Sequence, residues 1–224
     1  MPRKKGRPRA GAELLTRERI LQTALKLVDA HGIDALSMRR LAAELDVDPM
    51  AIYHHVPGKE AVLEGIVHLA FAELRVEPGE DDDWREQVRA FARGYRDLVR
   101  NHPHLTLLLI ANVEAGGASV LKASERLYEA LERSGLPQEL IVPAAGVIVD
   151  YVHGFALSEG LALGAGASGG GTGLAALLER HPGLSLPAMR RAMGASPVAS
   201  GPADLEGGID LILAGIEALI PPGG

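Results

Sequence analysis

Hydroxyl, imidazole and basic side chains gather in residues 37–59 of this 224-residue chain, which read SMRRLAAELDVDPMAIYHHVPGK. Such groups hydrogen-bond to phosphate oxygens, and side chains at the start of a helix reach the edges of DNA bases. Two short helices joined by a turn of three residues would place these groups on one surface. The spacing therefore predicts a helix-turn-helix whose second helix lies in the major groove of DNA.

The helices that position these side chains are indicated by apolar spacings of three and four residues, which also argue against β-strands along almost the whole chain. Thr16 is the expected N-cap of a helix over residues 17–31, and Gly32 follows where a left-handed C-terminal residue belongs. Ser37 is the expected N-cap of a second helix, which continues to about Leu45. The predicted fold is all-α.

The third helix is predicted from a cap and a first-turn proline, Asp48 and Pro49, and is expected to continue through His55. A fourth helix is expected over residues 59–76, so that residues 15–76 form a helix-turn-helix domain. The apolar residues expected in its core are Leu21, Leu25, Val28, Leu36, Leu41, Leu45, Val47, Ile52 and Val56.

The predicted DNA contacts divide between phosphates, which position the domain, and base edges, which specify the sequence. A lysine at the N-terminus of the fourth helix would add its charge to the helix dipole in attracting a phosphate. The expected phosphate contacts are Ser37, Arg39, Arg40, Tyr53 and Lys59. The third helix adds Asp48, Pro49, Met50, His54 and His55, and we expect Met50, Tyr53, His54 and His55 to divide between core and groove.

The first nine residues, MPRKKGRPR, carry five positive charges and no acidic group. Residues 1–14 are predicted to be a disordered basic arm. The segment KGRP within it resembles the core of an AT-hook, in which arginine enters a narrow minor groove. Arg7 is therefore a candidate minor-groove contact, with nonspecific attraction to phosphates as an equal alternative.

Charge is distributed unevenly along the chain. Residues 1–59 contain 11 Lys and Arg against 7 Asp and Glu, a net charge of +4, whereas residues 60–224 contain 12 against 22, a net charge of −10. The two values recover the overall charge of −6. This asymmetry indicates one segment that faces nucleic acid and a second segment with another task.

Composition excludes several classes of protein. Hydrophobic residues make up 47% and charged residues 23% of the chain, as in ordinary globular proteins. The absence of cysteine excludes disulfides, thiolate metal sites and cysteine nucleophiles. The basic N-terminus lacks the apolar stretch of a signal peptide, and we see no run approaching the uncharged apolar length of a membrane span. We therefore expect a cytoplasmic protein without a membrane partner.

Residues 77–224 are predicted to form a larger helical domain, which begins after the polar boundary EPGEDDD at residues 77–83. The Gly-rich segment at residues 164–173 lacks the lysine of a phosphate-binding loop and is predicted to be a flexible linker. Helices are expected over residues 84–101, 103–111, 117–134, 137–164, 172–181, 186–194 and 203–220.

Several motifs in the first third of the chain fit one pattern: Leu15-Thr16-Arg17-Glu18-Arg19-Ile20-Leu21, Gly32-Ile33, Ser37-Met38-Arg39-Arg40-Leu41-Ala42, Val47, Tyr53-His54-His55-Val56 and Lys59-Glu60. They resemble the N-terminal domain of the TetR family of repressors. The resemblance implies an all-α homodimer whose divergent C-terminal domain binds an inducer and then releases DNA. Asp46 stands where the family usually has glycine, and aspartate tolerates the left-handed conformation at a modest cost.

Two later motifs, YRDLV at residues 95–99 and HPHL at residues 102–105, are similar to the C-terminal domain of tetracycline repressors. In that family a histidine of this segment helps to bind a magnesium–drug complex, and the resemblance places His104 there. A hard cation prefers several oxygen ligands, and one histidine supplies no such set. No metal site and no required cofactor are therefore predicted.

An inducer pocket is expected within residues 84–164, because ligand pockets combine apolar walls with a few polar groups. The inducer itself is not identified by the sequence, and each candidate taken singly is better explained as core. The candidate lining residues are Phe91, Tyr95, His104, Leu108, Asn112, Tyr128, Tyr151 and His153, with Leu98, Leu105, Leu109, Val113 and Leu127 as further apolar candidates.

The helices expected at about 137–164 and 203–220 each carry a broad apolar face. Two such helices from each of two subunits would close a four-helix bundle around a two-fold axis, although a buried monomer core explains the same pattern. The TetR resemblance favours the homodimer, and a dimer predicts a palindromic operator in double-stranded DNA.

Two other functions compete with this interpretation. An all-α enzyme is disfavoured, because the chain shows no nucleophile elbow, no metal-spaced His-Glu pair and no paired-carboxylate motif. A ligand-independent architectural DNA-binding protein is disfavoured by the long acidic C-terminal segment, which bending DNA would not require. The sequence thus predicts a DNA-binding transcriptional regulator, a homodimeric repressor that a small-molecule inducer releases from its operator.

Overall fold

The structure is a computed structural model that describes residues 14–74, 83–164, 170–195 and 204–222. Over these residues it contains helices and no β-strand, so the predicted all-α fold is confirmed. The α-helices are α1 (Arg17–His31), α2 (Met38–Leu45), α3 (Pro49–Tyr53), α4 (Lys59–Ala72), α5 (Trp84–Asn101), α6 (Pro103–Ala111), α7 (Gly117–Arg133), α8 (Gln138–Gly164), α9 (Gly170–Arg180), α10 (Pro187–Ala195) and α11 (Leu205–Glu217). Two short 3-10 helices are η1 (Ile33–Ala35) and η2 (Val113–Gly116).

Most predicted helix boundaries agree with the structure, and the errors lie at helix ends. The fourth helix was expected to reach residue 76, but α4 ends at Ala72, because the backbone N–H groups of Glu73 and Leu74 close the last turn on the carbonyls of Ala70 and Phe71. The third helix ends at Tyr53 instead of His55, since His54 is its C-cap. The predicted domain boundary between residues 76 and 77 and the basic arm with Arg7 lie outside the described residues.

The predicted linker at residues 164–173 was partly wrong. Helix α9 begins at Gly170, so its first turn is built from residues that the Gly-rich composition assigned to a flexible segment. Residues 165–169 lie outside the described part of the chain.

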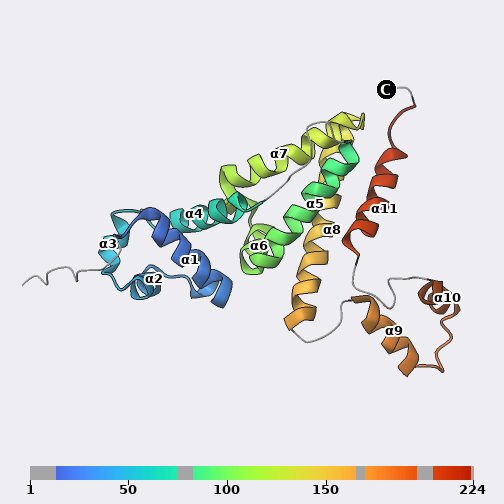
Figure 1. Ribbon diagram of the computed structural model, residues 1–224, viewed down its shortest axis with the longest axis horizontal. Helices are drawn as coiled ribbons and strands as arrows, with labels where there is room; N and C mark the ends of the chain where they lie inside the picture. The colour runs from blue at the N-terminus through green and yellow to red at the C-terminus, as the bar shows by residue number, and fades with distance from the viewer. Residues whose placement is uncertain (1–13, 75–82, 165–169, 196–203, 223–224) are drawn as a thin grey trace, which may run out of the picture.

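Helices α1–α4 and η1 form a compact unit, which we call the head (Figure 1). Three of its helices begin with a side-chain cap: Thr16, Ser37 and Asp48 accept hydrogen bonds from the backbone N–H groups of Arg19, Arg40 and Met50 at 3.1, 3.2 and 2.8 Å. These bonds satisfy N–H groups that a helix start otherwise leaves without a partner. The predicted caps thus fix where the first three helices begin.

The turn between α2 and α3 has the left-handed conformation that the sequence requires. Asp46 has φ 54° and ψ 45°, and it is the one non-glycine residue with positive φ among the described residues. The backbone N–H groups of Asp46 and Val47 close the end of α2 on the carbonyl groups of Ala43 and Ala42, respectively. Aspartate therefore serves at the position where the family usually has glycine.

The head encloses its own apolar core, to which a helix from later in the chain contributes. Ile20, Leu41 and Ile52 are fully buried in this core. Leu105 and Leu109 of α6 belong to the same cluster; both were expected in the wall of an inducer pocket, and of the two only Leu109 also lines a cavity. Helix α6 is thus packed as part of the head as well as of the region that follows.

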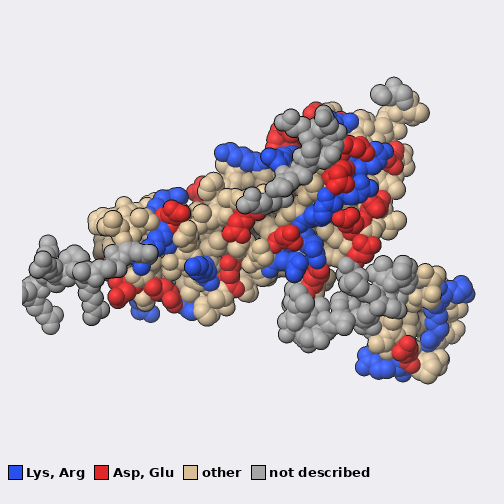
Figure 2. All heavy atoms as spheres, in the orientation of Figure 1, with Lys and Arg blue, Asp and Glu red and all other residues tan. Residues whose placement is uncertain are grey.

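Helices α5, α7, α8 and α11 form a second bundle with a separate core, which we call the body (Figure 1). Acidic and basic side chains alternate over the surface where α5 meets α11 (Figure 2). Arg89 pairs there with Asp210 at 2.8 Å and Arg93 with Glu206 at 2.9 Å. These exposed pairs fix the register of the two helices more than they stabilise the fold.

Helix α8 differs from the expectation that no segment approaches the apolar length of a membrane span. Its segment Gln138–Glu159 has a mean hydropathy of 1.7 and is long and apolar enough to span a membrane, by length and composition alone. One face of the helix packs into the body core through Ala145, Ile148 and Val152. Only 28% of the apolar window is buried, so much of its remaining apolar surface lies open in the single chain.

Candidate DNA-binding and ligand-binding sites

Four predicted DNA-contacting side chains, in α3 and in the two residues that follow it, lie on the outer surface of the head. Met50 is 63% exposed and Tyr53 43% exposed, and His54 and His55 are also exposed. The expectation that these four residues divide between core and groove was therefore wrong. Ile52 and Val56 alone anchor this segment in the core, because three- and four-residue spacing turns them inward.

The predicted phosphate contacts surround α3 on the same unit. Arg39 and Arg40 are exposed in the first turn of α2, and Lys59 is the first residue of α4. The N-terminal amides of α4 are not capped by a side chain, which leaves a positive helix end beside a lysine. Ser37 and Asp48 use their side-chain oxygens as helix caps, and the Ser37 hydroxyl retains its O–H to donate.

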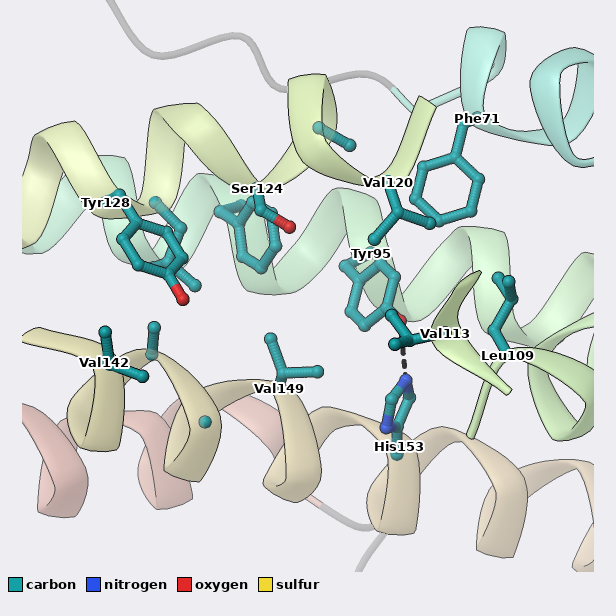
Figure 3. Close-up of a pocket in the computed structure, with 15 residues that line it drawn as sticks. Phe71, Tyr95, Leu109, Val113, Val120, Ser124, Tyr128, Val142, Val149 and His153 are labelled. Carbon is teal, nitrogen blue, oxygen red and sulfur yellow. Dashed lines mark hydrogen bonds between the residues drawn. The ribbon is translucent and has the colours of Figure 1, made fainter. Parts of the chain in front are cut away.

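A cavity of about 270 Å³ lies in the body, where α5, α7 and α8 approach the ends of α4 and α6 (Figure 3). None of its lining residues is an acid, a lysine or an arginine. The lining residues are Phe71, Phe91, Tyr95, Leu109, Val113, Val120, Ala123, Ser124, Leu127, Tyr128, Val142, Ala145, Gly146, Val149 and His153. The wall is thus apolar and aromatic, with a few neutral polar groups.

Tyr95 and His153 form a hydrogen-bonded pair at one end of this cavity (Figure 3). The Tyr95 hydroxyl lies 2.5 Å from Nε2 of His153, and the Tyr95 ring stacks on Phe91 with centroids 5.6 Å apart. Burial raises the pKa of Tyr95, with a smaller contribution from Asp150, and burial lowers the pKa of His153. Both shifts favour the neutral forms of the two groups, and a neutral hydroxyl and a neutral imidazole can share this hydrogen bond.

Four of the eight candidate pocket residues line this cavity: Phe91, Tyr95, Tyr128 and His153. The other four, His104, Leu108, Asn112 and Tyr151, do not. The imidazole of His104 lies against Gly32 at the end of α1, and Leu108 packs on the head core. Asn112 caps η2 and Tyr151 faces the start of α11, because each helix turns these positions away from the cavity.

Other lining residues were not among the sequence candidates. Phe71 comes from α4, and its contribution depends on how the head docks on the body, for which no local sequence signal exists. Ser124, Val142 and Val149 lie at positions that the helical spacing made equally suitable for core. No group of three His, Asp or Glu side chains that would hold a metal ion occurs among the described residues.

An open apolar groove of about 320 Å³ lies on the opposite side of α8, against α11. It is built from residues of the two predicted dimer helices and of the segment before α8. Its lining residues are Leu136, Leu140, Pro143, Ala144, Val147, Ile212, Gly215, Ile216 and Leu219. Of these, Val147 and Leu219 are more than half exposed in the single chain.

Comparison with known proteins matches both parts of the chain to one family. Residues 20–66 match the profile of the bacterial regulatory proteins of the tetR family, and residues 77–220 match the tetracyclin repressor-like C-terminal domain. The chain belongs to the TetR family. Its TetR-type helix-turn-helix is therefore shown by profile as well as by geometry.

Individual relatives agree with this assignment. An HTH-type transcriptional regulator of Saccharopolyspora erythraea is 32% identical over 146 residues, which cover 65% of this chain and 61% of the relative. The chain thus spans about three fifths of the length of the curated relatives that match it first.

Solved structures of TetR-type proteins cover nearly the whole chain. ActR of Streptomyces coelicolor in complex with actinorhodin has a TM-score of 0.71 and 30% identity, covering 94% of this chain and 99% of ActR. BioQ with its double-stranded DNA operator has a TM-score of 0.62 and 25% identity, covering 92% and 99%. The two-part helical architecture is therefore shared over more than nine tenths of the chain, at 92–94% coverage.

Proposed function

We propose that this TetR-family protein is a homodimeric repressor that binds a palindromic operator through its two heads and is released by a small molecule bound in the body cavity. The observation that carries the proposal is the cavity itself, since its wall includes Phe71 from the last turn of α4. The same helix begins at Lys59, beside the predicted DNA-reading surface. One rigid helix thus connects the cavity to the head.

The DNA-contacting residues in this proposal are those exposed around α3. Tyr53, Arg39, Arg40, Ser37 and Lys59 bind phosphates, and Arg7 of the basic arm reaches the minor groove. The groove-facing side chains are Asp48, Pro49, Met50, His54 and His55. The BioQ complex with an operator supports this use of the shared architecture.

The dimer in this proposal forms through α8 and α11. The groove between these helices is apolar, and Val147 and Leu211 present large exposed side chains on the same two helices. A two-fold axis would bring the same patch of a second chain against it, as in an isologous interface. This arrangement covers the open apolar surface of α8 without a membrane, in keeping with a cytoplasmic regulator that has no enzymatic activity.

The ligand in this proposal is an uncharged, flat aromatic molecule with a hydroxyl or carbonyl group. The cavity offers aromatic walls from Phe91 and Tyr128, and its polar end is the neutral pair of Tyr95 and His153. A carboxylate or phosphate would be buried there without a cation to balance it, at a large desolvation cost. ActR, which was solved with actinorhodin, supports small-molecule binding by a protein of this architecture.

Selection of binding sites from a random duplex pool, near physiological salt, tests the DNA-binding part of the proposal. We expect an enriched palindrome that two chains bind. The mass of the protein–DNA complex, measured by sedimentation, gives the number of chains. High salt is avoided because phosphate contacts weaken steeply with ionic strength, and low salt because nonspecific binding then dominates. Recovery of no motif, or of a motif without two-fold symmetry, would contradict a dimeric operator-binding repressor.

Calorimetry with two matched probes tests the ligand-binding part independently. Dihydroxyanthraquinone is flat and neutral, and its carboxylated derivative adds one charge to the same ring system. We expect the neutral probe to bind and the charged probe to bind at least about a hundredfold more weakly, because the cavity lacks a cation. Equal affinity for the two probes would contradict the proposed ligand class.

A further inference from the structure

One titratable group outside the cavity is buried between the head and the body. His102 follows α5 and caps α6, and its side chain is only 7% exposed. Nδ1 lies 3.0 Å from both carboxylate oxygens of Asp29 in α1, and Nε2 lies 3.4 Å from Glu73 at the end of α4. The sequence analysis had singled out His104 in this motif, whereas the charged contacts belong to His102.

The arrangement matches the charged form of histidine. Neutral imidazole has a single N–H and donates to one acceptor, whereas imidazolium donates from both nitrogens. Carboxylates on both sides of the ring are therefore both satisfied only when His102 is protonated. The hydrogen bond with Asp29 raises the pKa of His102 most, burial opposes it, and the charges of Asp29 and Glu73 add to it.

The groups that face His102 come from the elements packed around it. Asp29 belongs to α1 and Glu73 follows α4, and these are the charged groups that shift its pKa among the described residues. His104, on α6 itself, turns toward Gly32 instead. The backbone carbonyl of His102 accepts from the N–H and the hydroxyl of Thr106, which ties the ring to the first turn of α6.

The position of His102 on α6 links it to both functional regions. Leu105 and Leu109 of that helix lie in the head core, and Leu109 also lines the body cavity. In Figure 1, α6 lies where the head meets the body. A shift of α6 at the cavity end would therefore change the distances from His102 to the two carboxylates at the other end.

We propose that His102 is a positioning residue, a protonated clamp that ties α1 and the end of α4 to the start of α6 and makes the placement of the head depend on pH. When the clamp is intact, the head is held in one orientation on the body. When the proton is lost, one of the two carboxylates loses its donor and the orientation of the head becomes less restricted. The inference goes beyond the proposed repressor function and does not depend on the identity of the inducer.

The direction of the pH effect follows from the raised pKa. A group whose pKa is higher in the folded protein stabilises it fully below its ordinary pKa, which is 6.5 for histidine. That contribution disappears as the pH rises through the higher folded value. The head is therefore held most firmly in mildly acidic solution and becomes looser in alkaline solution.

Because the chain has no cysteine, two introduced cysteines can carry spin labels at unique positions. Ala43→Cys in α2 and Glu129→Cys in α7 are both exposed and report the distance from head to body. Labelled chains diluted with unlabelled chains give this distance within one protein chain. We expect one narrow distance distribution at about pH 6 that broadens at about pH 9, as the imidazolium loses its proton.

Two substitutions in the same motif distinguish the effect of the His102 charge from other effects of pH. His102→Gln, which cannot carry a charge, should show a broad distribution at both pH values, whereas His104→Gln should behave like the parent. A pH-dependent broadening that persists in His102→Gln, or a parent distribution that does not change with pH, would overturn the proposal.

A titration by nuclear magnetic resonance keeps the proposal testable if His102→Gln does not fold. The pKa of His102 should lie above 6.5 in the parent and fall in Asp29→Asn, with a smaller fall in Glu73→Gln. The order follows from the two contacts, since Asp29 is closer and less exposed than Glu73. A His102 that titrates at or below 6.5 in the folded parent would refute the clamp.

Discussion

In the head, α1, α2 and α3 begin at a residue whose side chain caps the helix and α4 does not, whereas in the body α5 and α7 begin without a side-chain cap and α11 begins with one, Asp204. The head residues that would face DNA are exposed around a complete core, and the body keeps a cavity whose wall includes the exposed Val113 and Val142. The head is thus defined by local signals and close packing. The body is defined by how helices meet, which leaves room for a ligand.

Helix α6 contributes both to the head and to the body. Its Leu105 and Leu109 complete the head core, Leu109 also lines the cavity, and His102 at its start faces carboxylates from two head helices. A cavity that closes on a ligand can therefore act on the head without any direct contact between ligand and DNA. By linkage, operator DNA must then change the affinity for the ligand by the same factor.

The largest expected effect contrasts the head core with the cavity wall. Ile52→Ala should lower the free energy of unfolding by about 2–5 kcal/mol, because Ile52 is fully buried in close-packed surroundings. Val149→Ala, which enlarges an existing cavity, should cost about 1 kcal/mol or less. Urea denaturation measures both values. Equal losses would show that the cavity is as tightly packed as the head.

The next largest effect is on DNA affinity, and it distinguishes residues that contact phosphates from residues that read the base sequence. Tyr53→Ala should weaken binding to every duplex by roughly tenfold, because it removes a hydrogen bond to a charged phosphate. Met50→Ala should change the preference between the selected operator and its base-substituted variants, also by roughly tenfold. Fluorescence anisotropy at fixed salt measures each affinity. If both variants weakened all duplexes equally, this division of roles would be wrong.

Deletion of one hydroxyl tests the polar end of the cavity. Tyr95→Phe should weaken dihydroxyanthraquinone binding by about tenfold or less, the range of a single neutral hydrogen bond. Operator affinity should not change, because Tyr95 is far from the reading surface and its ring stacking on Phe91 remains. Calorimetry and anisotropy on the same preparation provide the two readouts. A loss of operator binding alone would contradict the separation of the two regions.

The smallest effect concerns an ion pair that joins α5 to α8. Arg96 binds Glu159 through two hydrogen bonds of 2.6 Å, and the hydrogen bond with Arg96 lowers the pKa of Glu159 most. Glu159→Gln should therefore lower stability by about 1 kcal/mol near neutral pH. The contribution exists above the ordinary pKa of 4.5 and is lost as the pH falls through the lower folded value. Parent and variant should converge in acid during urea denaturation.

The sequence predicted the head well because its signals are local. Caps at Thr16, Ser37 and Asp48 are recognisable from residue type and spacing, and the left-handed turn at Asp46 was expected from the family resemblance. The cavity was predicted only in part, since helical spacing marks an apolar face but not what that face meets. Phe71 became a wall residue through the docking of the head, which no single segment specifies.

The HPHL motif illustrates the same limit. The sequence resemblance drew attention to His104, but the structure turns that side chain toward Gly32. His102, two residues earlier, is buried between carboxylates that lie 73 and 29 residues away in the chain. Partners at such separations are set by tertiary packing, so neither periodicity nor motif could distinguish the two histidines.

The most direct measurement of control by the cavity compares two glycine substitutions in α8. A Cβ added to Gly146 or to Gly154 meets nothing within 4 Å, so a side chain can begin at either position, and of the two only Gly146 lines the cavity. The experiment follows release of the selected operator as dihydroxyanthraquinone is added. We predict release in the parent and in Gly154→Leu, with Gly146→Leu binding the operator normally and resisting release. Equal release from all three proteins would contradict control of the head through this cavity.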